Sequence, residues 1–118
     1  MKKKRATVIW ENSEGRILLV KMPKNYWMLP GGYPETSETR MAAAIRELRE
    51  ETGLIAAEVK TLFEYESEHR LHKVFGVKAE GAPRAMPPEI VQVAYFDEVP
   101  AEKISKSTQE IVRLYREQ

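Results

Sequence analysis

Residues 32–54 read Gly-Tyr-Pro-Glu-Thr-Ser-Glu-Thr-Arg-Met-Ala-Ala-Ala-Ile-Arg-Glu-Leu-Arg-Glu-Glu-Thr-Gly-Leu, and this stretch decides the fold. Residues advance by about 100° around an α-helix, so residues three and four positions apart share one side of it. An apolar stripe with this spacing consists of Met41, Ala44, Ile45 and Leu48. Thr36 or Ser37 is the predicted N-cap, and Gly53 stands where a left-handed residue commonly ends a helix. The stretch therefore predicts an amphipathic helix that ends at Gly53.

Three carboxylates lie beside this apolar stripe. Glu47, Glu50 and Glu51 are also three and four positions apart, so they share a neighbouring sector of the helix. Like charges at this spacing repel by roughly 0.2–0.5 kcal/mol per pair, and Arg46 and Arg49 offset only part of that cost. A hard divalent cation neutralises clustered carboxylates and commonly links them to substrate phosphates. A charge run alone usually indicates a solvated, ion-paired helix face. Gly31-Gly32, the spacing to Glu38 and the position of the carboxylates beside the apolar stripe favour a metal site instead.

The stretch resembles the signature of Nudix hydrolases, G-x5-E-x7-R-E-U-x-E-E-x-G-U, in which U is a bulky aliphatic residue. The identities are Gly32, Glu38, Arg46, Glu47, Glu50, Glu51 and Gly53, and Leu48 and Leu54 occupy aliphatic positions. With residue usage near one in twenty, seven fixed identities coincide by chance on the order of once in a billion starts, and glutamate richness relaxes this by about a hundredfold. The resemblance implies an α/β (α+β) fold, the Nudix α/β/α sandwich with a mixed sheet packed between helices.

The resemblance also implies a metal site. Glu47, Glu50 and Glu51 are expected to bind Mg²⁺ or Mn²⁺, and the backbone carbonyl of Gly31 is a further expected ligand. Glu47 is the expected general base, although in some family members a carboxylate outside the signature has this role. Arg46 is expected to orient a signature glutamate rather than touch substrate.

Four further carboxylates are candidates for supporting the metal ligands or for adding one. Glu38 is expected either to hydrogen-bond to the groups that bind the metal or to act as a supplementary metal ligand itself. Outside the signature, Glu89 is the preferred additional ligand, weighed evenly against a plain surface glutamate. Glu66 and Glu68, in a polar turn, are weaker candidates for the same role.

Substrate contacts are expected near the glycine turn. Gly31 and Gly32 allow the backbone to approach a phosphate closely. Lys21 and Lys24 are candidates to bind phosphates. Aromatic residues that could stack on a base are Tyr26, Trp27 and Phe75, although aromatics in strands more often belong to the core. His69 and His72 are assigned no role.

The reaction implied by the resemblance is metal-dependent hydrolysis of a diphosphate linkage in a nucleoside diphosphate linked to another group. The expected substrate is a nucleoside or oxidised deoxynucleoside triphosphate, hydrolysed to the monophosphate and pyrophosphate. Nucleotide-sugars and dinucleoside polyphosphates are alternatives. A non-catalytic nucleotide-sensing module and a helix that only packs are competing hypotheses. A homodimer is left open.

Composition bounds the other possibilities. The 118 residues are 42% hydrophobic, which suits a single domain across residues 1–118. A net charge of +1 gives no bias toward polyanions or membrane surfaces, so nucleic-acid binding is not expected. With no cysteine, disulfides and thiol catalysis are excluded, and a cytoplasmic location is expected. The basic residues 1–5 are expected to form a solvated tail that leads into a strand.

Period-two alternation and turn residues predict the remaining elements. The expected strands cover residues 7–10, 17–20, 26–29, 57–65, 71–79 and 91–96. A loop is expected over 80–88, and Pro100 is expected to mark a break. A final helix, capped by Ser105 or Ser107, is expected to run through Arg116, with Ile111, Leu114 and Tyr115 on its buried side.

Overall fold

The structure, a computed structural model, describes residues 1–98 and 103–118 and contains two helices and seven strands in this part of the chain. The elements are β1 (Lys3–Trp10), β2 (Ile17–Met22), β3 (Tyr26–Met28), β4 (Gly31–Gly32), α1 (Arg40–Thr52), β5 (Ile55–Glu66), β6 (Arg70–Glu80), β7 (Gln92–Phe96) and α2 (Lys106–Arg116). The mixed α+β class with two helices packed on mixed sheets confirms the predicted fold class. The predicted break at Pro100 lies outside the described residues.

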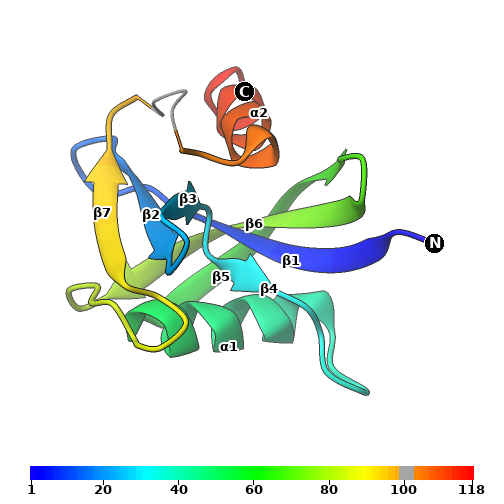
Figure 1. Ribbon diagram of the computed structural model, residues 1–118, viewed down its shortest axis with the longest axis horizontal. Helices are drawn as coiled ribbons and strands as arrows, with labels where there is room; N and C mark the ends of the chain where they lie inside the picture. Colours follow the sequence, from blue (N-terminus) through cyan, green and yellow to red (C-terminus); the bar gives the residue numbers. More distant parts are fainter. Residues whose placement is uncertain (99–102) are drawn as a thin grey trace.

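The strands form two sheets (Figure 1). The first is four-stranded and mixed, in the order β4-β1-β6-β5, because β1 runs parallel to β6 but antiparallel to β4. The second is three-stranded and antiparallel, in the order β3-β2-β7. The two-residue strand β4 thus lies at an edge of the first sheet, next to β1.

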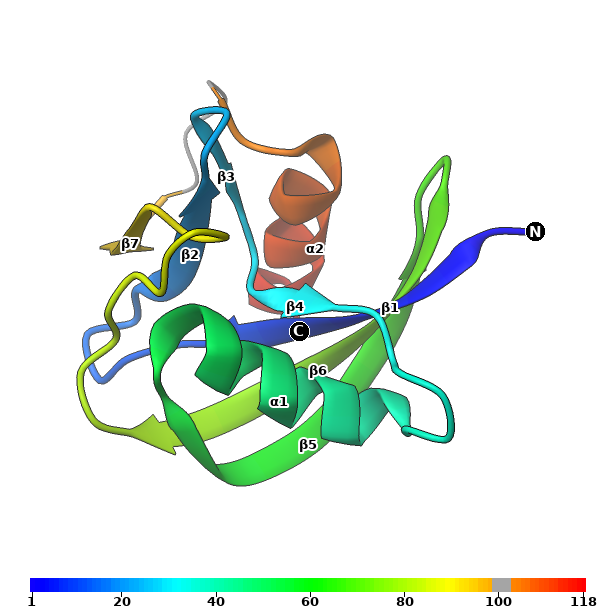
Figure 2. The same ribbon diagram turned by 60° about the horizontal axis from the view of Figure 1, so that its bottom comes forward.

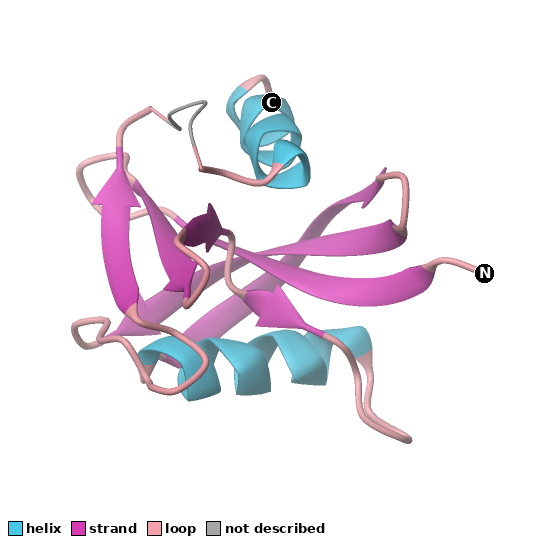
Figure 3. Ribbon diagram, viewed as in Figure 1, coloured by secondary structure: helices cyan, strands magenta, loops and turns pink. Residues whose placement is uncertain are grey.

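The helices cover opposite faces of the first sheet (Figures 1 and 3). Viewed from below, α1 lies across this sheet while α2 lies behind it (Figure 2). Alternation along β1 explains the division. Ala6 and Val8 pack with α1 in one buried cluster, whereas Ile9 packs with α2 in the other. Each face of β1 therefore belongs to a different core.

The start of β1 corrects the predicted solvated tail. The strand begins at Lys3, and the Arg5 side chain is buried, with only 5% of the residue exposed. The residue lies on the same face of β1 as Thr7 and Ile9, so it enters the interior with them. The strand thus begins at Lys3 rather than at the predicted Thr7, and the charged residue Arg5 occupies a buried position in it.

Helix α1 ends as predicted but begins differently. Gly53 adopts a left-handed conformation with φ 75°, and its N–H donates to the Arg49 carbonyl. The N-cap is Thr39, whose Oγ1 accepts from the Ala42 N–H at 3.0 Å, so the predicted caps Thr36 and Ser37 are wrong. The helix starts later because the chain first makes a turn in which Ser37 has a φ of 67°.

The buried stripes of both helices are rotated slightly from the predicted ones. On α1, Ala44 and Leu48 are buried as predicted, but Met41 and Ile45 are 39% and 38% exposed. Ala43 replaces them on the buried side because β1 and β5 approach the helix from that direction.

On α2, the Ser105 cap and buried Ile111 confirm the prediction. Val112, rather than the half-buried Leu114 and Tyr115, completes its inner face. Within the described residues, neither helix has the length and apolar character needed to cross a bilayer.

Candidate functional site

A cavity of about 720 Å³ is lined by residues from both sheets and from α1. Gly31 and Gly32 of β4 form part of its wall, and Glu47 and Glu51 reach it from α1. Three signature residues, Gly32, Glu47 and Glu51, therefore share one space with residues of β1, β2, β3 and β6, whereas Glu38, Arg46 and Glu50 do not line it. This cavity is the candidate functional site.

The glycines of β4 let the carboxylates of α1 approach the sheet edge. Gly31 donates its N–H to Glu51 Oε1 at 3.1 Å. A Cβ atom on Gly32 would lie 1.6 Å from Glu47 Oε2, and one on Gly31 would lie 2.1 Å from the Ala6 carbonyl oxygen. Any side chain at either position would displace the carboxylate or the strand, so this close approach requires glycine at both.

Arg46 connects the other signature carboxylates. Its Nη1 donates to Glu47 Oε1 and to Glu50 Oε1, each at 2.9 Å. Its Nε and Nη2 donate to the two oxygens of Glu38, each at 2.8 Å, and Nη2 also donates to the Tyr33 carbonyl. These bonds from Arg46 lower the pKa of Glu38 to about 2. The guanidinium thus ties Glu38 to the two helix glutamates, which is the placement expected of an orienting residue.

Burial changes the proton affinity of the two inner carboxylates. Burial raises the pKa of Glu51 to about 8, against the opposing effects of the Gly31 N–H and the Arg5 charge. Burial also raises the pKa of Glu47 to about 7, and the nearby charges of Glu50 and Glu89 add to the increase. Without a further cation these carboxyls hold protons near neutral pH, because the local positive charge is too small to ionise both.

The residues present suit a hard divalent cation. Within residues 1–98 and 103–118, no three acidic or imidazole side chains already converge as metal ligands, and Arg46 instead neutralises Glu47 and Glu50. The available donors are carboxylate oxygens and the backbone of a glycine turn, which are the ligands that Mg²⁺ and Mn²⁺ prefer. The raised pKa values of Glu47 and Glu51 indicate a place where added positive charge is favourable.

The carboxylates considered outside the signature differ in position. Glu89, in the segment before β7, lines the same cavity as Glu47 and Glu51. Glu66 and Glu68 instead lie at the turn between β5 and β6, where Glu66 pairs with Lys2. Neither residue of that turn lines the cavity, so their position gives no support for a ligand role.

Two of the predicted substrate-binding residues lie outside the cavity. Lys21 and Trp27 face each other across β2 and β3, with Lys21 Nζ 5.7 Å from the centre of the Trp27 ring. The Trp27 ring packs edge-on against Phe96 at 5.1 Å. Side chains alternate along a strand, so their neighbours Met22 and Tyr26 line the cavity instead. On β3 the cavity thus contains Tyr26, one of the two predicted aromatic candidates, and on β2 it contains Met22 rather than Lys21.

The other substrate candidates divide in the same way. Lys24 lines the cavity, as does Tyr33, which follows the glycine turn. Phe75 is 1% exposed and belongs to the core beneath α1, so it cannot stack on a ligand here.

Sequence reasoning missed three basic residues in the cavity wall. Arg5 of β1 and Arg70 and His72 of β6 line the cavity together. In the parallel pairing of these strands, Arg5 lies opposite His72. A usable signal existed in the alternation Arg5-x-Thr7-x-Ile9, which puts the arginine on the same strand face as a buried isoleucine.

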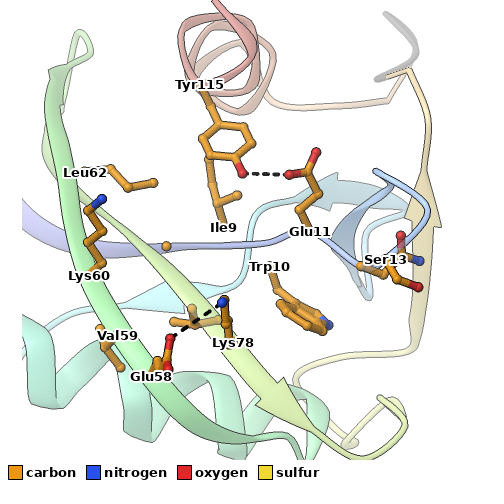
Figure 4. A pocket seen from close by; sticks show the side chains of 13 residues that line it. Ile9, Trp10, Glu11, Ser13, Glu58, Val59, Lys60, Leu62, Lys78 and Tyr115 are labelled. Atoms are coloured by element: carbon orange, nitrogen blue, oxygen red, sulfur yellow. Dashed lines mark hydrogen bonds and ion pairs between the residues drawn. The ribbon is translucent and has the colours of Figure 1, made fainter. Parts of the chain in front are cut away.

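A second cavity, of about 890 Å³, is formed by the end of β1, by β5 and β6, and by α2 (Figure 4). Four of its polar side chains form two pairs, since Tyr115 donates to Glu11 at 2.8 Å and Lys78 lies 3.8 Å from Glu58. It contains none of the signature residues. The cavity lined by Glu47 and Glu51 is therefore the better candidate for an active site.

Comparison with known proteins agrees with this geometry. A family model described as NUDIX domain matches residues 1–116. The crystal structure of a putative nudix hydrolase family member from Chromobacterium violaceum superposes with a TM-score of 0.89 at 31% sequence identity, covering 99% of this chain and 78% of that one.

Two curated relatives each match about half of the chain. The ADP-ribose pyrophosphatase of Methanocaldococcus jannaschii is 41% identical over 61 residues, which is 48% of this chain and 36% of that protein. The RNA pyrophosphohydrolase of Halorhodospira halophila is 41% identical over 56 residues, which is 47% of this chain and 31% of that protein. The matches thus cover about a third of the length of each relative.

Proposed function

The chain belongs to the NUDIX domain family, and from this premise we propose that it is a divalent-metal-dependent pyrophosphohydrolase of nucleoside diphosphate derivatives. The observation that carries the proposal is the approach of Glu47 and Glu51 to β4, where Gly31 and Gly32 have no side chains to block them. These carboxylates, with the raised pKa values that burial gives them, share one cavity with basic residues suited to an anionic substrate. A helix that only packs would not need this arrangement.

In this proposal Glu47, Glu50 and Glu51 hold the cation, and the Gly31 carbonyl and Glu89 are further donors. When bound, Mg²⁺ or Mn²⁺ supplies positive charge to the phosphate oxygens and makes a nearby water more acidic. Glu38 acts indirectly, because its bidentate contact fixes the guanidinium of Arg46.

Glu47 is the proposed general base. Its side chain is 16% exposed, compared with 43% for Glu50, and Arg46 holds one of its oxygens at 2.9 Å. A water molecule attacks a phosphorus atom of the diphosphate and gives its proton to Glu47. A new phosphorus–oxygen bond forms to the water oxygen, and the anhydride phosphorus–oxygen bond breaks. The leaving phosphate oxygen carries away the electron pair.

The proposed substrate is a nucleoside or oxidised deoxynucleoside triphosphate, which would give the monophosphate and pyrophosphate. The apolar side of the cavity, with Val20, Met22, Tyr26 and Met28, suits a flat base. A nucleotide-sugar is the second candidate, because one relative that is 41% identical over 61 residues is named an ADP-ribose pyrophosphatase. The cytoplasmic location and the homodimer remain predictions from the sequence.

The test is a hydrolysis panel in Mg²⁺ and in Mn²⁺. The panel contains the common and 8-oxidised nucleoside triphosphates, ADP-ribose, a dinucleoside tetraphosphate and a 5′-triphosphorylated RNA oligomer. Reaction in ¹⁸O-labelled water identifies the phosphorus atom that is attacked. We expect hydrolysis that requires the metal, with the label in one of the two phosphate products.

Two variants provide the controls. Glu51→Gln should lose activity, whereas Glu58→Gln, at an exposed carboxylate paired with Lys78, should retain it. Metal binding without hydrolysis of any panel member would contradict the enzymatic proposal and favour a nucleotide-sensing module.

A further inference from the structure

His72 is a buried histidine in the wall of the candidate site. Only 3% of the residue is exposed, and it lies on β6 opposite Arg5 of β1. Its Nδ1 lies 2.8 Å from Thr7 Oγ1, and the Tyr65 ring packs beside the imidazole, with the ring centres 5.9 Å apart. The imidazole is thus held by a hydrogen bond on one edge and by an aromatic neighbour.

The hydrogen bonds around Thr7 fix which ring nitrogen carries the hydrogen. Arg5 Nη1 donates to Thr7 Oγ1 at 2.8 Å, and a guanidinium can only donate. The Thr7 hydroxyl therefore accepts from Arg5; it has a second lone pair, but only donation to His72 Nδ1 gives its own hydrogen a partner. Among the described residues these are its two hydrogen-bond partners. His72 Nδ1 is accordingly an acceptor, and a neutral ring then has its hydrogen on Nε2.

The imidazole is neutral in this environment. Burial lowers the pKa of His72 to about 4, and the positive charges of Arg5 and Arg70 contribute to the decrease. The side chain therefore offers one N–H donor, on Nε2, throughout the neutral pH range.

That donor has no partner within the described part of the protein. The Nε2 atom is buried and makes no hydrogen bond there. Buried polar groups in native proteins are nearly always hydrogen-bonded, and an unsatisfied one costs about 1–3 kcal/mol. The Nε2–H group of His72 is buried and unsatisfied, and the residue lines the ligand cavity. This is the arrangement expected of a donor whose acceptor is supplied by a bound ligand.

We propose that His72 is a specificity-determining residue, whose Nε2–H donates a hydrogen bond to an acceptor oxygen on the nucleoside part of the substrate, with Thr7 and Arg5 as positioning residues. This inference rests on the proposed function and extends it to substrate choice. An oxo group on the base satisfies the donor, whereas an amino group at the same place leaves two donors facing each other. A site built in this way discriminates between bases that differ only by that exchange.

The tautomer is tested directly on the metal-free protein. Long-range ¹H–¹⁵N correlation spectra distinguish a protonated from an unprotonated ring nitrogen, and the chain has two histidines, so a His69→Phe variant assigns the signals. We expect an unprotonated Nδ1 and a protonated Nε2 for His72 between about pH 6 and pH 8. A hydrogen on Nδ1 of His72 would overturn the inference.

Ligand reading is tested by calorimetric titration with nucleoside monophosphates in Mg²⁺. The probes are the pairs IMP with AMP and UMP with CMP, which differ by an oxo-for-amino exchange, together with ribose 5-phosphate. His72→Phe should weaken binding of the oxo member of at least one pair by about 3- to 10-fold, the factor expected for a neutral hydrogen bond, and its amino partner by much less. Equal losses for every probe, ribose 5-phosphate included, would place the acceptor on the shared sugar phosphate and would overturn the role of His72 in base choice.

The same titration can refute the inference. Affinities unchanged by His72→Phe, a larger loss for an amino member, or absence of binding of every probe to the wild-type protein would each overturn it. His69→Phe, at an exposed position in the β5–β6 turn, is the matched control and should change no affinity. Since neither measurement needs turnover, an inactive protein would refute the proposed hydrolysis while leaving the reading of His72 to these results.

Discussion

Arg46 donates hydrogen bonds to three carboxylates at once, so its guanidinium offsets part of the negative charge of Glu38, Glu47 and Glu50. Glu38 accepts from two nitrogens of Arg46, whereas Glu47 and Glu50 accept from Nη1 alone, which leaves the helix glutamates freer to change partners. The division of labour among the glutamates can therefore be tested one residue at a time.

Glu47→Gln should lower kcat by at least about 100-fold while the fold remains intact, because an amide cannot accept the proton of the attacking water. Steady-state kinetics in Mg²⁺ measure the loss, and circular dichroism and thermal unfolding check the fold. The variant should not unfold at a lower temperature, since it removes a buried carboxyl whose pKa is raised to about 7 by that burial. Near-full turnover would rule out Glu47 as the base.

Glu50→Gln should instead weaken metal binding. Glu50 is the most exposed of the three glutamates in the site, and it shares Arg46 with Glu47. Calorimetric titration with Mn²⁺ should show a lower affinity than in the wild-type protein, with Glu58→Gln as the control at an exposed ion pair. Unchanged affinity would exclude Glu50 as a ligand.

At this scale the sequence predicted the residues of the signature but not those facing them. Glu47, Glu51 and Glu89 do share the cavity, and fixed spacing along one helix made the first two predictable. Arg5 and His72 come from strands whose pairing joins distant parts of the chain. Alternation along β1 indicates which face Arg5 takes, but nothing local to either residue reveals that pairing, so their meeting in the cavity wall could not be predicted.

Among the elements, the pair formed by α1 and β4 does most to shape the site. The helix supplies carboxylates, and the two-residue strand supplies a backbone without side chains in front of them. The carboxylates of α1 can reach the sheet edge only because β4 consists of two glycines.

Gly32→Ala should therefore reduce activity strongly, because a Cβ atom there would lie 1.6 Å from Glu47 Oε2 and displace that carboxylate. Gly81→Ala is the comparison. It has open space around it but a φ of +97°, so it should lose about 1 kcal/mol of unfolding free energy and keep its kcat. Kinetics and chemical denaturation on both variants separate the effects. Wild-type kcat in Gly32→Ala would show that the close approach has no catalytic importance.

Most strands were predictable to within a few residues from alternation and turn residues, and both helices from spacing. The errors came from tertiary contacts. The sequence did not distinguish Tyr26 from Trp27 as the residue that faces the cavity, because a three-residue strand shows almost no alternation and the packing of Trp27 on Phe96 decides which side faces inward. The cap at Thr39 was missed because several neighbouring hydroxyl residues offered equivalent local signals.

At the scale of the whole molecule, the buried carboxyls of Glu47 and Glu51 make the stability of the fold depend on pH. In the metal-free protein the pKa values of Glu47 and Glu51 are about 7 and about 8, both raised by burial from 4.5. The folded state therefore binds more protons than the unfolded chain between about pH 4.5 and pH 8. The stability contributed by these groups falls as pH rises through that window.

Bound Mg²⁺ needs the ionised carboxylates, so it should raise the unfolding temperature more at about pH 8 than at about pH 6. At a concentration 100 times the dissociation constant, the gain in unfolding free energy is about 2.7 kcal/mol. Thermal unfolding in Mg²⁺ and in EDTA at the two pH values measures the difference. An equal metal effect at both, or none at either, would contradict the assignment of these glutamates as ligands.

The parallel pairing of β1 with β6 also has a consequence during protein synthesis. Lys3 pairs with Arg70 and Trp10 with Val77, so β1 is synthesised well before β6 and cannot pair with it until β6 has been made. Pairings between distant segments form slowly because the chain loses much entropy before contacts compensate. We therefore expect the basic wall of the cavity to be completed late, after the β5–β6 hairpin. Pulsed hydrogen exchange during refolding should protect the β1 amides no earlier than those of the hairpin, and earlier protection of β1 would contradict this order.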